Sequence, residues 1–177
     1  MRDKLQIIQT VILRPRLVPD QIKGSQKKEI SLFLIILYSF AYTLNQSQDL
    51  ALLYVFFTAV AIAFGLIIGT VLYGQLLGWV TSLFSKEEVS NKIRLVIPYS
   101  FVPLIMGQLF VFVISNEHMA VVVNWIFTIW SLIILTILLS EVKKIKLIKA
   151  LFSVITALLI WLTPFLLIYF VVIKFFT

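Results

Sequence analysis

The stretch LALLYVFFTAVAIAFGLIIGTVLYGQLLGWVTSLF, residues 50–84, carries no charged side chain. A helix that crosses a membrane needs about 20 apolar residues, so this segment is long enough to span a bilayer. As one straight helix it would be about 50 Å long, well beyond a hydrocarbon core of about 30 Å. We therefore expect a span that tilts, protrudes, or bends or breaks near Gly69–Gly74, because glycine weakens a helix there.

The rest of the chain repeats this apolar pattern. Of its 177 residues, 61% are hydrophobic and only 13% are charged, whereas about a quarter of a soluble domain is charged. The sequence predicts an all-α integral membrane protein, a bundle of five transmembrane helices that forms one membrane domain over residues 29–177. The five predicted spans are residues 30–46, 50–84, 97–115, 119–140 and 150–173.

The basic residues predict the orientation of the bundle. Of the 15 Lys and Arg residues, all but Lys174 lie before the first predicted span, between the second and third, or between the fourth and fifth. Cytoplasmic loops concentrate Lys and Arg, so this distribution places the amino terminus, residues 1–28, in the cytoplasm and the carboxyl terminus outside. Dividing residues 50–84 into two spans would destroy this asymmetry.

Two short amphipathic helices are expected at the cytoplasmic membrane surface, one near the amino terminus and one between the second and third spans. Each is predicted from apolar residues that share one helical face beside basic residues. The two sets are Leu5, Ile8 and Ile12, and Val89, Ile93 and Val96.

Glycine spacing marks the candidate interface. Gly65 and Gly69 are four residues apart, as are Gly74 and Gly78. Small residues at this spacing let two helix backbones approach closely in lipid. On an unbroken helix, Gly65 and Gly74 would lie about 180° apart, so the two pairs would face different neighbours. Packing within the protein, an interface with a second copy and an interface with another membrane protein all fit this pattern.

Few polar side chains lie within the predicted spans, and Gln75, Gln108 and Asn124 are the candidates for a polar path. None of the spans contains an ionisable Asp, Glu, Lys, Arg or His. Ionisable residues at depth usually mark proton and ion routes, so a proton- or sodium-coupled pump is disfavoured. Hydrogen bonding between helices is the simpler interpretation of these amides.

Proline predicts three kinks, because its ring removes a backbone donor. Pro98 and Pro103 lie at the start of the third span, and Pro164 lies within the fifth. Ser100 is expected to bond in part to the carbonyl that Pro103 leaves free one turn back.

The residues needed for enzymatic chemistry are scarce. The chain has no cysteine and one histidine, His118, in a predicted outer loop. We therefore expect no catalytic residue, no metal site and no cofactor. The sequence also suggests no nucleic acid partner and no identifiable small-molecule substrate.

The order of several short motifs resembles the Yip-domain (Ypt/Rab-interacting protein) family of five-span membrane proteins, in a bacterial-type member. These motifs are Arg14-Pro15, Gly74-Gln75-Leu76-Leu77-Gly78, Tyr99-Ser100-x-x-Pro103, the run from Trp130 to Leu135, and Glu141-Val142-Lys143-Lys144 followed by Lys149-Ala150. The resemblance implies the same five-span architecture with the amino terminus inside. Eukaryotic members assist vesicle trafficking with small GTPases through a longer cytosolic segment than these 28 residues. Some bacterial relatives are similar to small partners encoded beside ABC-type exporters.

We therefore expect a non-enzymatic scaffold or accessory protein in the bacterial cell membrane. It would associate with another membrane protein, or with itself, through its glycine-lined helix faces, in an ABC-type exporter complex or in membrane trafficking. The alternative is a small pore or solute transporter with a path lined at the Gly69–Gly74 bend. A third hypothesis is a lipid-binding or scrambling protein, which would need a polar groove open to the bilayer.

Overall fold

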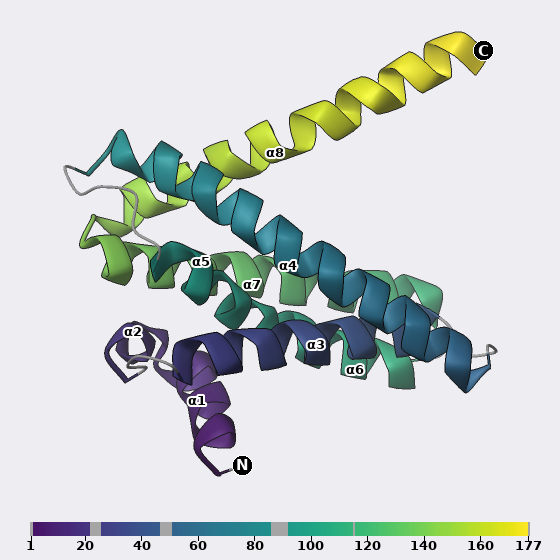
Figure 1. Ribbon diagram of the computed structural model, residues 1–177, viewed down its shortest axis with the longest axis horizontal. Helices are drawn as coiled ribbons and strands as arrows, with labels where there is room; N and C mark the ends of the chain where they lie inside the picture. The colour runs from purple at the N-terminus through teal and green to yellow at the C-terminus, as the bar shows by residue number, and fades with distance from the viewer. Residues whose placement is uncertain (1, 22–25, 47–50, 86–91, 115, 177) are drawn as a thin grey trace.

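The computed structural model describes residues 2–21, 26–46, 51–85, 92–114 and 116–176. Of residues 2–5, 20–21, 26–27 and 170–176 it describes the backbone alone. Every element in this part of the chain is a helix (Figure 1). The elements are α1 (Arg2–Leu13), η1 (Pro15–Leu17), α2 (Val18–Gln21), α3 (Gln26–Gln46), α4 (Leu52–Ser82), α5 (Lys92–Val96), η2 (Ile97–Ser100), α6 (Phe101–Val113), α7 (Glu117–Lys143) and α8 (Leu147–Phe176).

Four helical segments of the described chain are long and apolar enough to cross a membrane, and this confirms an all-helical, multi-pass membrane protein. They are Leu52–Ser82, Lys92–Val113, Glu117–Lys143 and Leu147–Tyr169. The predicted first span corresponds to α3, which is 21 residues long and does not meet the same criteria. Its first turn carries Lys27, Lys28 and Glu29, and its last residues are Asn45 and Gln46. The number of five spans therefore stays a prediction.

The helices pack around two apolar clusters. One joins α1, α3, α6 and α7 and includes Leu34, Tyr99 and Leu138. The other joins α4, α5, α7 and α8 and includes Leu77 and Val154. Because α7 contributes to both clusters, it connects the two halves of the bundle.

The two predicted surface helices have different outcomes. Helix α1 is present, and its Val11 is completely buried in the first cluster, with Ile8 and Ile12 packed against it. The second lies partly outside the described residues, since residues 86–91 are not described. Its described end is α5, where Ile93 and Val96 are buried. In both helices these apolar side chains contact the protein, and a position at the membrane surface stays a prediction.

Helix α4 is unbroken over its 31 residues, so the break expected near Gly69–Gly74 is absent. A glycine costs a helix only about 1 kcal/mol relative to alanine. In an apolar surrounding, an unpaired backbone group costs several kcal/mol. Keeping the helical hydrogen bonds intact is therefore favoured over breaking the helix at glycine.

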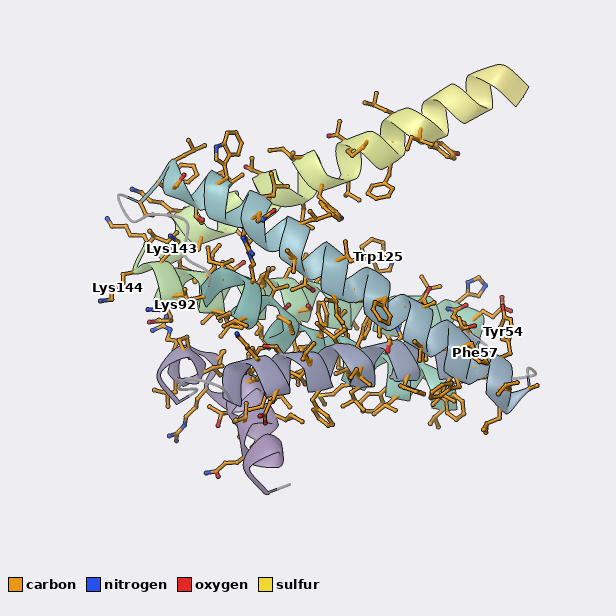
Figure 2. All side chains as sticks on the ribbon, viewed as in Figure 1. Tyr54, Phe57, Lys92, Trp125, Lys143 and Lys144 are labelled. Atoms are coloured by element: carbon orange, nitrogen blue, oxygen red, sulfur yellow. The ribbon has the colours of Figure 1, made fainter. Side chains whose placement is uncertain are left out.

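The helix ends that carry basic residues lie together at one end of the bundle. The first turn of α3, the last turns of α4 and α7, and the starts of α5 and α8 lie at one end of the bundle (Figure 1). Lys92, Lys143 and Lys144 are labelled there, whereas Tyr54 and Phe57 lie near the opposite end (Figure 2). We call the first of these the basic end. Which side of the membrane it faces stays a prediction.

Candidate functional site

The two glycine pairs of α4 meet different surroundings. Gly74 and Gly78 are buried. A Cβ atom added at Gly74 would lie 2.8 Å from Cγ and 3.2 Å from Cα of Arg94, and 3.2 Å from Cδ1 of Ile97. Gly74 therefore allows α5 and η2 to pack directly against the α4 backbone.

Gly65 and Gly69, by contrast, have open space in front of them. A Cβ atom added at either position would meet nothing within 4 Å. Gly65 is exposed and Gly69 is half-buried. This pair is therefore not used for close helix packing among the described residues.

A cleft of about 380 Å³ lies beside this open pair, and we call it the α4–α8 cleft. Its walls come from α4 and α8, and its floor comes from η2, α6 and α7. The lining includes Gly65, Leu66 and Gly69 of α4, Leu158 and Trp161 of α8, Phe101 of α6, and Ser131 and Leu132 of α7. Tyr73 and Trp161 approach edge to face, with ring centroids 6.2 Å apart.

Helix α8 leaves the bundle beyond this cleft. Figure 1 shows its carboxyl-terminal half diverging from α4 and projecting away from the other helices. Its apolar side chains from Leu162 to Tyr169 are exposed. One wall of the α4–α8 cleft therefore continues into an exposed apolar helix surface.

The candidate polar residues do not gather at one place. Gln108 is 3% exposed, accepts a hydrogen bond from Nδ2 of Asn45 at 2.9 Å, and donates one to Oδ1 of Asn124 at 3.2 Å. Gln75 is exposed on α4 and takes no part in this network. Gln108 and Asn124 thus connect α6 to α7, with Asn45 of α3 as a third member that the sequence reasoning missed.

The two prolines of the third predicted span lie in or beside the 3₁₀ turn η2, where an amide normally bonds to the carbonyl three residues earlier. Pro98 cannot donate to the carbonyl of Leu95, and that carbonyl accepts a bond from Ser31 Oγ at 2.7 Å. Pro103 is the third residue of the α-helix α6, so its missing amide is among those that a helix start leaves unpaired. The carbonyl of Ser100, the N-cap residue of α6, accepts a bond from Ser131 Oγ at 2.6 Å.

Serine hydroxyls of neighbouring helices therefore bond to backbone carbonyls beside both prolines. The hydroxyl of Ser100 instead donates to the carbonyl of Ile97 at 2.7 Å. Sequence reasoning missed Ser31 and Ser131, although both are hydroxyl residues within predicted spans. Pro164 lies inside α8, which continues through it.

The described residues offer little for metal or cofactor chemistry. No three His, Cys, Asp or Glu side chains come together there as metal ligands. The α4–α8 cleft is apolar, with hydroxyl groups as its polar members. Such a cleft can bind apolar groups that fit its shape.

The family of the chain follows from one comparison. The model of the Yip1 domain matches residues 10–176, from α1 to the end of α8. The chain belongs to the Yip1 domain family. No curated protein and no solved structure gives a significant match. All four candidate spans and the described residues that line the α4–α8 cleft lie within the matched residues.

Proposed function

We propose that this Yip1 domain protein is a non-enzymatic accessory subunit that holds a transmembrane helix of another membrane protein in its α4–α8 cleft. The observation that supports the proposal best is the open pair Gly65 and Gly69. Small residues that allow close helix approach lie there without a neighbouring helix among the described residues. The exposed end of α8 supplies a second surface for the same partner.

The size of the cleft limits how the partner would fit. A volume of about 380 Å³ holds a few side chains but not a whole helix, which is about 10 Å across. The partner helix would therefore rest its backbone over Gly65 and Gly69 and insert one or two large apolar side chains between α4 and α8. In lipid, such packing and the release of bound lipid drive association.

We also propose that α3 is the fifth span and that the basic end faces the cytoplasm, in the cell membrane of a bacterium. Helix α3 packs along α4 and α6, two elements of candidate spans. Its apolar stretch from Ile30 to Leu44 would be about 22 Å long, and local thinning of the bilayer or snorkelling of flanking residues would accommodate it. The charge asymmetry then follows the rule for cytoplasmic loops.

A pore through the protein has less support. Helix α4 is continuous at Gly69 and Gly74, where a bend was expected to line the pore. The buried amide of Gln108 is bonded on both sides, to Asn45 and to Asn124.

Site-specific photocrosslinking tests the accessory function. A photoreactive residue at Leu66, which lines the α4–α8 cleft, is expected to give one discrete protein adduct in native membranes. The same residue at Thr156, an exposed position of α8 that does not line the cleft, is expected to give none.

The glycines provide the matched variant. A Cβ atom added at Gly69 meets nothing within 4 Å, so Gly69→Leu should extend into the open space and abolish the adduct while the protein still folds. Thr156→Leu adds similar bulk outside the cleft and should leave the adduct intact. An adduct that survives Gly69→Leu, or lipid-sized adducts alone at Leu66, would contradict the proposal.

A further inference from the structure

A second groove lies on the other side of α4, between α3 and α4. Its volume is about 410 Å³, within the range of about 300–1,000 Å³ that small-molecule sites occupy. The two helices diverge toward the basic end, and α5 lies between them (Figure 1). We call this the α3–α4 groove.

The polarity of the α3–α4 groove changes along its length. Lys28 and Arg94 line the part nearest the basic end, and no carboxylate is among the described residues that line it. Toward the middle of the bundle the lining becomes apolar, through Leu32 and Ile35 of α3 and Ile67 of α4. From Lys28 to Ile35 the distance along α3 is about 10 Å.

Arg94 is held in position by its packing. Its Cγ atom lies against the backbone of Gly74, where a Cβ atom would be only 2.8 Å away. Helix α5 is itself attached to α3, because Ser31 Oγ donates to the carbonyl of Leu95 at 2.7 Å. Among the described residues, neither Lys28 nor Arg94 forms an ion pair with a carboxylate.

We propose that the α3–α4 groove binds one anionic phospholipid. Its phosphate would contact Lys28 and Arg94, and an acyl chain would lie along Leu32, Ile35 and Ile67. This occupant matches the groove because it carries a negative charge at one end and an apolar chain at the other. A free anion would leave the apolar part unoccupied, and a zwitterionic lipid would leave the two positive charges without a net counter-charge. Among the described lining residues the site shares only Thr70 with the α4–α8 cleft, and the proposal does not rest on the accessory function.

Native mass spectrometry of the full-length protein in an uncharged detergent tests the proposal, with phosphatidylglycerol or phosphatidylcholine added in matched titrations. We expect one phosphatidylglycerol to be retained in preference to phosphatidylcholine. A basic residue near the membrane surface contributes about 1 kcal/mol to anionic lipid binding. Lys28→Gln combined with Arg94→Gln should therefore weaken phosphatidylglycerol binding about thirtyfold, the equivalent of about 2 kcal/mol.

The control removes the same charge elsewhere. Lys144 and Lys149 are exposed at the α7–α8 connection and do not line the groove. Lys144→Gln combined with Lys149→Gln should leave phosphatidylglycerol binding unchanged. Lys28→Gln alone changes an exposed side chain in the first turn of α3, so it should fold normally and weaken binding about fivefold.

A third variant separates a lipid from a free anion. Ile67→Trp fills the apolar part of the groove and keeps both charges, so it should prevent phosphatidylglycerol binding. Equal binding of the two lipids would overturn the proposal, as would an equal loss in the Lys144 and Lys149 control. Displacement of the lipid by inorganic phosphate, or unchanged binding in Ile67→Trp, would do the same by assigning the site to a free anion.

Discussion

Gly69 and Gly74 are five residues apart on α4, yet an added side chain would meet open space at one and protein at the other. Alanine should therefore be tolerated at Gly69 but not at Gly74. Alanine gains about 1 kcal/mol over glycine in a helix, whereas forcing an extra carbon into a packed site costs about 1–3 kcal/mol. At Gly74 the clash includes the backbone Cα of Arg94, which a side-chain rotation cannot relieve.

We therefore expect Gly74→Ala to destabilise the protein by up to about 2 kcal/mol, and Gly69→Ala to leave it unchanged or slightly more stable. Thermal unfolding in detergent, followed by circular dichroism, measures both. Equal melting temperatures for the two variants would show that the α4–α5 contact is looser than the structure indicates.

Gln108 allows a second test at a single residue. Gln108→Leu removes two hydrogen bonds between helices, each worth about 0.6 kcal/mol on average in a membrane protein. We expect a loss of about 1 kcal/mol in stability. Gln75→Leu is the matched control, because Gln75 is exposed and the structure shows no hydrogen bond from it to a described residue. A larger loss in the control would contradict the proposed role of the network.

Among the elements, the junction of η2 and α6 depends on its neighbours. Carbonyls beside its prolines accept hydrogen bonds from Ser31 of α3 and Ser131 of α7, so these hydroxyls connect three helices at one point. A hydrogen bond contributes about 0.5–1.5 kcal/mol to stability. Ser131→Ala should therefore destabilise the protein by about 1 kcal/mol, which chemical denaturation in detergent would measure.

The extent of α4 was predictable from its uncharged sequence: residues 50–84 were expected and Leu52–Ser82 is observed. The α4–α8 cleft was not predictable, because it depends on how far α8 diverges from α4. That divergence is set by packing between side chains far apart in sequence, such as Tyr73 against Trp161. The glycine spacing identified a candidate interface, but it did not show that only Gly65 and Gly69 are open.

At the scale of the whole molecule, the gathering of the helix ends near Lys92, Lys143 and Lys144 at one end of the bundle supports the proposed topology (Figure 2). Both proposed sites depend on that topology. If α3 spans the membrane, the α3–α4 groove opens to lipid at the headgroup level and the α4–α8 cleft faces the bilayer interior. If α3 does not span, Lys28 is no longer placed beside lipid headgroups.

Cysteine accessibility measures this directly, because the chain has no cysteine of its own. Single cysteines are introduced at Gln9 of α1, at Ala51 before α4 and at Lys144 after α7, all exposed positions, and treated with a membrane-impermeant maleimide in intact cells. The account predicts labelling of Ala51→Cys in intact cells, and of Gln9→Cys and Lys144→Cys only after permeabilisation. Labelling of Gln9→Cys and Ala51→Cys from the same side would contradict it.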